Sequence, residues 1–314
     1  MAARRWSLSG AGFLGAWHLG ACDALLKANA ITPACEIAGA SAGALVGAVV
    51  VTGTPISVAR EHLRTLVQRT RKSPLGVLTP GFSLVDQLRG ALSADLPSDA
   101  HHLASGRLHV AMTSLRSHEF GQTRHQSQFG SRDELIAAVT ASSDIPGLTG
   151  NLRNAAGMRS AAASATSEEE EMPSTALLLQ RWLRRSDIDG GILDLFPDPW
   201  AAAATEPLPA AEPSGDAAVA FISPFAGVGF AIAPPRVLGA KTIPAWSPIC
   251  ASSNGRVLDL TAENVTRWRH AFLPPEDHVL QAYERAGYEA AQQWLSAHGL
   301  GARLGGSARV TDVT

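Results

Sequence analysis

Residues 34–51 read ACEIAGASAGALVGAVVV, and this stretch decides the fold of the 314-residue chain. It begins as a short strand, turns tightly at 39–43, and continues as an apolar helix to about Val51. Upstream, residues 5–9 (RWSLS) predict a strand, which a glycine-rich turn joins to a helix that reaches about Asn29. Strand, helix, strand and helix in this order indicate an α/β fold with parallel strands.

Hydrophobic periodicity predicts five further elements: helices over 57–72, 132–143 and 276–298, and strands over 106–114 and 219–224. We expect one domain over 1–300, interrupted by a flexible insertion over 151–180 and a Pro/Ala-rich loop over 198–218. Residues 301–314 predict a flexible tail.

The composition is 46% hydrophobic and 17% charged, which is enough apolar material for a large core. The formal net charge is -2, so nucleic acid is not an expected partner. Cys22, Cys35 and Cys250 are odd in number and too scattered for a disulfide framework or a metal site, so we expect reduced core thiols and no metal. We also expect no cofactor. Uncharged runs over 6–22 and 37–53 mimic a signal peptide and a membrane helix. We interpret both as buried parts of one site, which predicts a cytoplasmic chain with neither a signal peptide nor a transmembrane helix.

A glycine-rich turn joins the first strand to the first helix and reads Gly10-Ala11-Gly12-Phe13-Leu14-Gly15, a G-x-G-x-x-G motif. One interpretation is a dinucleotide site, because this geometry cradles pyrophosphate at a helix N-terminus. The other is an oxyanion hole, because N–H groups of such a turn stabilise a developing negative charge.

The tight turn after the second strand reads Gly39-Ala40-Ser41-Ala42-Gly43 and matches G-x-S-x-G, the nucleophile elbow. The motif requires a strand before the serine and a helix after it, and the sequence predicts both. A buried small-residue helix without chemistry is the alternative for this motif alone, and the preceding glycine-rich turn favours the nucleophile.

A serine hydroxyl needs a base to remove its proton. Histidines occur at His18, His109, His270, His278 and His298, but none lies in a recognisable catalytic context, and His18 is better explained as a packed side chain.

A carboxylate offers another base in Asp189-Gly190-Gly191, since an aspartate before two glycines can approach a buried hydroxyl closely. In an extended segment Asp187 points to the same face and competes for the role. Alone, D-G-G is more typical of a plain turn.

Together and in this order, the three motifs resemble the patatin-like phospholipase family, and above all its adipose triglyceride lipase and adiponutrin branch. The similarity extends over roughly residues 5–300 outside the insertion and the Pro/Ala-rich loop. It is carried by WSLSGAGFLGAWHLG (6–20), LPSDAHHLASGRLHV (96–110), GSRDELIAAVTASSDIPG (130–147), IDGGILDLFP (188–197), ISPFAG (222–227) and the stretch 272–300. The chain departs from that branch at Leu195, where the branch usually has asparagine.

The resemblance implies a three-layer α/β/α sandwich with a mainly parallel central sheet. It implies that Ser41 is the nucleophile, Asp189 the base and the 10–15 turn the oxyanion hole, with no histidine needed. It further implies a neutral glycerolipid substrate, triacylglycerol first, at a lipid droplet or membrane surface, and leaves the identity of any protein co-activator open.

Four alternatives remain at this point. The chain could cleave phospholipids or galactolipids, transfer the acyl group to a second lipid alcohol, act as a non-catalytic lipid-surface protein, or bind a nucleotide at the glycine-rich turn.

Overall fold

The computed structural model describes most of the chain, namely residues 5–114, 122–145, 149, 187–189, 191, 194–200, 219–243 and 256–300. The insertion predicted over 151–180 and the tail over 301–314 lie outside these residues, as does nearly all of the 198–218 loop.

A six-stranded sheet in the order β4-β3-β2-β1-β6 forms the centre of the structure, and β5 also pairs with β3. Its strands are β1 (Arg5–Leu8), β2 (Glu36–Ala40), β3 (Leu108–Ser114), β4 (Gln122–Gln126), β5 (Asp187–Asp189) and β6 (Val219–Ile222). Strands β6, β1, β2 and β3 are parallel, whereas β4 and β5 run antiparallel to β3. The predicted α/β class with a mainly parallel sheet is therefore confirmed.

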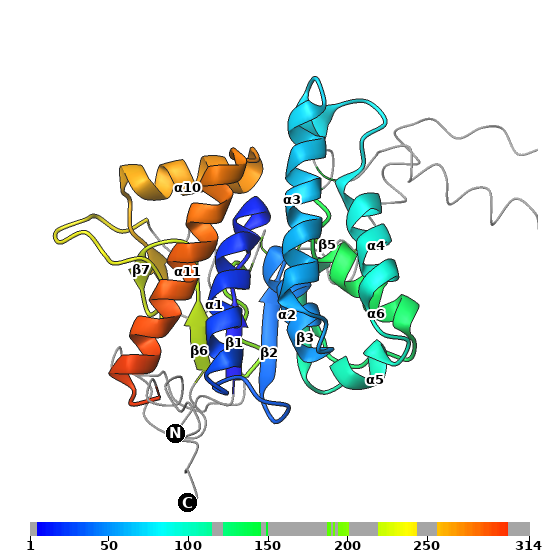
Figure 1. Cartoon of the computed structure of the whole chain (residues 1–314), viewed down its shortest axis with the longest axis horizontal. Helices are drawn as coiled ribbons and strands as arrows, with labels where there is room; N and C mark the ends of the chain where they lie inside the picture. The colour runs from blue at the N-terminus through cyan, green and yellow to red at the C-terminus, as the bar shows by residue number, and fades with distance from the viewer. Residues whose placement is uncertain are drawn as a thin grey trace, which may run out of the picture.

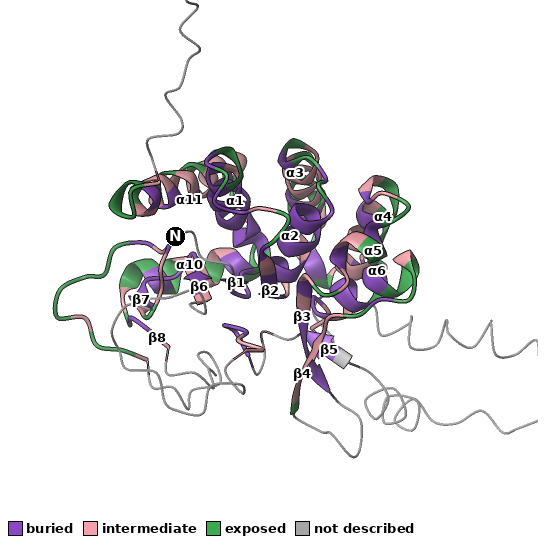
Figure 2. Cartoon of the chain, turned by 90° about the horizontal axis from the view of Figure 1, so that it is seen from below, coloured by how far each residue is buried: buried purple, intermediate pink, exposed green. Residues whose placement is uncertain are grey.

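Helices flank this sheet, and those labelled α1 to α6 and α11 lie on one side of it (Figure 2). The helices are α1 (Gly15–Lys27), α2 (Ala42–Val51), α3 (Ile56–Lys72), α4 (Leu84–Asp95), α5 (Ala100–Ala104), α6 (Arg132–Ala141), α10 (Ala262–Phe272) and α11 (Asp277–Ala297). Short 3-10 turns η1 (Gly12–Leu14) and η2 (Gly76–Leu78) and the strand pair β7 (Gly227–Val228) and β8 (Val257–Leu258) complete the described elements. In Figure 1, α1 and α11 lie side by side in front of the sheet.

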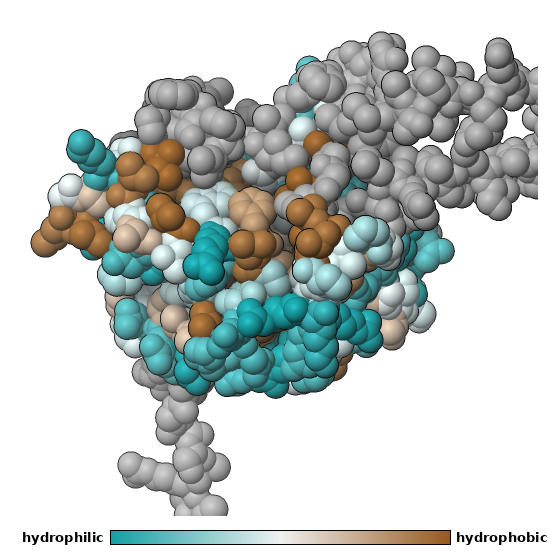
Figure 3. Space-filling model, turned by 90° about the horizontal axis from the view of Figure 1, so that it is seen from above, coloured by the Kyte–Doolittle hydropathy of each residue, from teal (hydrophilic) through white to brown (hydrophobic). Residues whose placement is uncertain are grey.

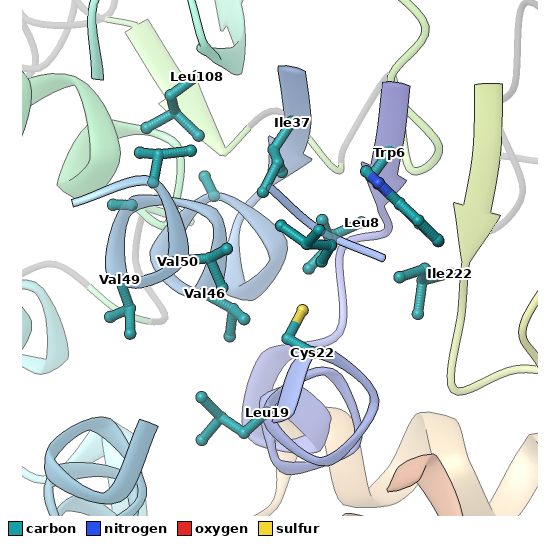
Figure 4. Packing of buried hydrophobic residues seen from close by; sticks show 14 of the residues in the cluster. Trp6, Leu8, Leu19, Cys22, Ile37, Val46, Val49, Val50, Leu108 and Ile222 are labelled. Atoms are coloured by element: carbon teal, nitrogen blue, oxygen red, sulfur yellow. The ribbon is translucent and has the colours of Figure 1, made fainter. Parts of the chain in front are cut away.

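The main core lies between the sheet and helices α1 and α2. Apolar side chains of three strands face Leu19 and Cys22 of α1 and Val46 of α2 (Figure 4). The strand side chains in this contact are Trp6, Leu8, Ile37 and Ile222. A second cluster on the other side of β6 joins Phe221 to Phe196 and to α10, so both faces of this strand are covered.

Helices α1 and α11 cross at unusually close range because each has a glycine at the crossing. A Cβ at Gly20 would lie 1.9 Å from the carbonyl oxygen of Glu284, and one at Gly287 would lie 2.2 Å from that of Trp17. Since α1 starts directly after η1, α11 braces the helix that carries the glycine-rich turn.

Every predicted element is present within a few residues of its expected ends, but α4, α5, α10, β4, β7 and β8 were not predicted. Cys22 is a buried free thiol, Cys35 is buried with its Sγ hydrogen-bonded to Thr32 and Ala30, and Cys250 lies outside the described residues. Within the described part of the chain, no helix has the length and apolar character needed to cross a membrane.

Candidate active site

A cavity of about 1430 Å³ opens at the carboxyl ends of the parallel strands. One face of α2 forms its floor through Ala42, Leu45, Val46 and Val49, while α3, α4 and α10 form its walls. Ser41, Asp189 and the turn containing Gly10 to Phe13 line the same cavity. The three sequence motifs therefore converge on one mostly apolar space.

Ser41 joins β2 to α2 in a backbone conformation that L-residues rarely adopt, with φ 52° and ψ -123°. The chain can turn this tightly only with glycine on either side. A Cβ at Gly39 would lie 2.5 Å from the backbone of Gly43, and one at Gly43 would lie 2.3 Å from the carbonyl oxygen of Leu8. The strained turn presents the serine side chain at the helix N-terminus.

The strained turn is held in place by Ser142, a fully buried side chain just after α6. Its hydroxyl accepts a hydrogen bond from the N–H of Ser41 at 2.9 Å and donates to the carbonyl oxygen of Ala111 in β3 at 2.6 Å. Sequence reasoning missed this residue, because a serine next to a helix end has no distinctive pattern.

The register of β3 explains why Asp189 meets Ser41. Ala111 pairs with Ala40 at the end of β2, and the next residue, Met112, pairs with Asp189 at the end of β5. Because β4 occupies the other edge of β3, β5 continues along the edge where β2 stops. The end of β2, just before Ser41, therefore lies next to the end of β5 at Asp189.

Asp189 is a buried carboxylate that accepts hydrogen bonds from the Ser41 hydroxyl and from the N–H of Gly191, the latter at 2.7 Å. Burial raises the pKa of Asp189 to about 7, the two hydrogen bonds oppose this, and the nearby Asp144 adds to it. A carboxyl group with this pKa can take up a proton near neutral pH.

Asp144, two residues after Ser142, contacts Asp189. Its carbonyl oxygen accepts the N–H of Asp189 at 2.9 Å, and its side chain accepts a hydrogen bond from the Thr149 hydroxyl at 3.3 Å. Burial raises the pKa of Asp144 as well. One short segment after α6 thus contacts the backbone of both Ser41 and Asp189.

The glycine-rich turn has N–H groups of two kinds. Gly10 donates to the carbonyl oxygen of Leu195 at 2.9 Å, and the N–H groups of Leu14 and Gly15 bond back into η1. Those of Ala11, Gly12 and Phe13 have no partner among the described residues. Three consecutive donors are therefore available beside the cavity.

The turn also needs glycine at position 12. Gly12 has φ 51°, and a Cβ there would lie 2.1 Å from the carbonyl oxygen of Ala271 in α10. Glycine at position 12 thus permits both the left-handed backbone conformation and the close approach of α10.

His18 lies behind the turn, fully buried, with Nε2 donating to the carbonyl oxygen of Ser9 at 2.9 Å. Burial lowers the pKa of His18 to about 4, so this ring is neutral. His109, His270, His278 and His298 make contacts away from the cavity and do not line it. The backbone of Asp187 pairs with Ser114, while its side chain and Gly190 lie outside the described residues.

Three proteins of known name are similar to this chain in sequence. Patatin-like phospholipase domain-containing protein 2 of Rattus norvegicus is 40% identical over 150 residues, which cover 45% of this chain and 30% of that protein. A 1-acylglycerol-3-phosphate O-acyltransferase of Homo sapiens is 36% identical over 153 residues, covering 48% and 31%. An omega-hydroxyceramide transacylase of Homo sapiens is 30% identical over 295 residues, covering 92% and 45%.

The chain thus spans less than half the length of each of these relatives. The family model for patatin-like phospholipase matches residues 7–197, which include all three motifs. The chain therefore belongs to the patatin-like phospholipase family of lipid acyl hydrolases and transacylases.

Proposed function

We propose that this chain hydrolyses carboxylic esters of neutral glycerolipids, triacylglycerol first, with Ser41 as nucleophile and Asp189 as base. One observation carries the proposal: a buried carboxyl group with a pKa of about 7 accepts a hydrogen bond from the hydroxyl of a strained elbow serine. An aspartate at its ordinary pKa of about 4 would be a poor base, and burial supplies the missing proton affinity.

In the proposed reaction, Asp189 takes the proton of the Ser41 hydroxyl as the oxygen attacks the ester carbonyl. The alcohol leaves with that proton, and the acyl group stays on Ser41. Water then attacks the acyl-enzyme as Asp189 takes its proton, and Asp189 returns that proton to the Ser41 oxygen as the fatty acid is released. Neither step needs a metal or a cofactor.

The N–H groups of Ala11, Gly12 and Phe13 supply oxyanion donors in this mechanism, together with the N–H of Ala42 at the start of α2. This differs in detail from a hole built on all six residues of the turn, because Gly10, Leu14 and Gly15 already donate elsewhere. The N-terminal end of α2 adds a favourable partial charge.

The cavity supports a lipid substrate, since about 1430 Å³ of mostly apolar space exceeds what a small ester needs. Acyl transfer to a second lipid alcohol is the alternative that a specific observation favours. The relative whose similarity covers 92% of this chain is an omega-hydroxyceramide transacylase, and the same acyl-enzyme serves either acceptor.

A fluorophosphonate probe tests the nucleophile. We expect it to label the wild type and not Ser41→Ala, and Ser41→Ala to lose turnover on a lipid panel by several orders of magnitude. Product analysis with added diacylglycerol as acceptor separates hydrolysis from transfer. Equal labelling of both proteins would place the reactive nucleophile at another residue, and no labelling of the wild type would favour a non-catalytic role.

The base is tested by Asp189→Asn, with Asp187→Asn as its neighbour control. We expect the first to abolish ester cleavage and the second to retain most of it. The reverse result would move the base by two residues.

A further inference from the structure

Exposed apolar side chains concentrate beside the cavity. Of the nine large hydrophobic side chains exposed among the described residues, Leu260, Val265 and Phe272 line the cavity itself and Leu273 follows directly. Figure 3 looks down on the end of the molecule where Figure 1 places α10 and the end of α3, and shows hydrophobic residues gathered there. Apolar surface left in water beside an apolar cavity is typical of a contact surface.

The segment between α3 and α4 adds two exposed leucines to this surface. Leu75 is 65% exposed and Leu78 58%, whereas Val77 between them is buried in the cavity wall. Leu75 directly precedes the 3-10 turn η2 and Leu78 ends it, so both exposed leucines belong to one short turn. Neither of them lines the cavity.

Basic residues precede both apolar groups. The last turn of α3 contains Arg69, Arg71 and Lys72, just before Leu75. Arg71 pairs with Glu276 at 3.5 Å, whereas Lys72 is exposed and has no ion pair among the described residues.

The last turn of α10 has one such charge, Arg269, which is exposed just before Phe272 and Leu273, whereas burial lowers the pKa of the neighbouring His270. Exposed apolar side chains next to exposed basic residues complement a lipid surface with anionic head groups.

We propose that Leu75, Leu78, Phe272 and Leu273 form a docking face that inserts into an anionic phospholipid surface and brings the cavity against the lipid. The inference rests on the proposed function, since it gives the ester substrate a route from the lipid phase to Ser41. It assigns to this face a role in binding lipid surfaces that is separate from the chemistry.

Vesicle co-sedimentation tests the docking face with the double variant Leu75→Ser/Leu78→Ser. Vesicles of phosphatidylcholine with phosphatidylglycerol should bind this variant at least about tenfold more weakly than the wild type. The matched control is Val237→Ser/Leu238→Ser, which removes two exposed aliphatic side chains that do not line the cavity and should leave binding unchanged.

A charge variant, Lys72→Gln, should weaken binding to the anionic vesicles by about fivefold and leave binding to pure phosphatidylcholine vesicles unchanged. Equal binding of the wild type to both vesicle types would overturn the anionic part of the proposal. Wild-type binding by Leu75→Ser/Leu78→Ser, equal loss in the control pair, or no vesicle binding by the wild type would overturn the docking face.

Hydrolysis of p-nitrophenyl butyrate, a soluble ester, separates docking from chemistry. The leucine double variant should cleave it at the wild-type rate, which also shows that the fold is intact. A wild type that binds vesicles but cleaves no ester would sink the proposed function and leave the docking face standing.

Discussion

The backbone N–H of Ser41 donates to the hydroxyl of Ser142 at 2.9 Å, a contact between residues 101 positions apart in the sequence. The same hydroxyl donates to the carbonyl oxygen of Ala111 at 2.6 Å. Ser142 therefore ties the strained turn at Ser41 to the central strand β3. Because Asp189 pairs with the residue after Ala111, both members of the proposed dyad take their position from the same part of β3.

Replacing Ser142 by alanine should lower kcat by about 10- to 100-fold with little change in KM, because Ser41, the proposed nucleophile, loses its orientation while the cavity keeps its shape. We expect a stability loss of about 1–2 kcal/mol from the two lost hydrogen bonds. Steady-state kinetics on a soluble ester and urea unfolding measure the two effects. Ser143→Ala is the matched control, since the one hydrogen bond that this hydroxyl makes among the described residues goes back to Val139. Equal kcat losses in both variants would assign Ser142 a merely structural role.

The pKa of Asp189, about 7 in the folded chain against 3.8 for an unperturbed aspartate, predicts the pH dependence of activity. The base works only when it is deprotonated, so kcat/KM on a soluble ester should fall as the pH drops through about 7. A profile that stays flat down to about pH 5 would show that Asp189 titrates at its ordinary value.

The same pKa shift predicts that stability falls as the pH rises, whereas activity increases. A carboxyl group whose pKa is raised on folding contributes stability that is fully present below its unfolded pKa and is lost as the pH rises through its folded pKa. The loss for Asp189 therefore accumulates between about pH 4 and pH 7 and stays constant above. Asp189→Asn should melt at a higher temperature than the wild type at about pH 8, and this gain should disappear at about pH 4.

Local patterns made the fold around Ser41, the proposed nucleophile, predictable from the sequence. The strand, tight turn and apolar helix around Ser41 are contiguous, and the glycines at positions 39 and 43 are needed for close contacts within that segment and with Leu8. The link to Asp189 rested on resemblance, because the register that joins β2 and β5 through β3 is a long-range property of the sheet.

Two missed helices, by contrast, carried readable start signals. The hydroxyl of Ser83 accepts the N–H of Asp86 at the start of α4, and that of Thr261 accepts the N–H of Asn264 at the start of α10. A serine or threonine three residues before such a partner is typical of an N-cap. Ser142 had no comparable signal, since its role depends on partners in two other elements.

Gly12→Ala should damage both the fold and the site. The new Cβ would meet the carbonyl oxygen of Ala271 at 2.1 Å in a left-handed conformation, so α10 must move away from the turn. We expect a stability loss of about 2–4 kcal/mol and a drop in ester hydrolysis of at least about 100-fold. Gly53→Ala is the control, because Gly53 also has a positive φ, 71°, but no atom within 4 Å of its Cβ position. The free energy of unfolding of that variant should fall by only about 1–2 kcal/mol, and its activity should be kept. Equal effects in both variants would show that the contact with α10 does not matter.

The crossing of α1 and α11 gives a prediction outside the matched residues 7–197, since α11 begins at Asp277. Gly20→Ala and Gly287→Ala should each cost about 3 kcal/mol in urea unfolding, because each Cβ would press against a carbonyl oxygen of the partner helix. Gly90→Ala in α4 is the control, since its Cβ position is open, and should gain up to about 1 kcal/mol from helix propensity.

The double variant Gly20→Ala/Gly287→Ala distinguishes a shared crossing from two independent clashes. Once one Cβ has pushed the helices apart, the second meets less resistance, so the combined loss should fall short of the sum of the single losses. A strictly additive loss would show that each glycine acts through its own helix. In that case α11 would not brace the helix that follows the glycine-rich turn.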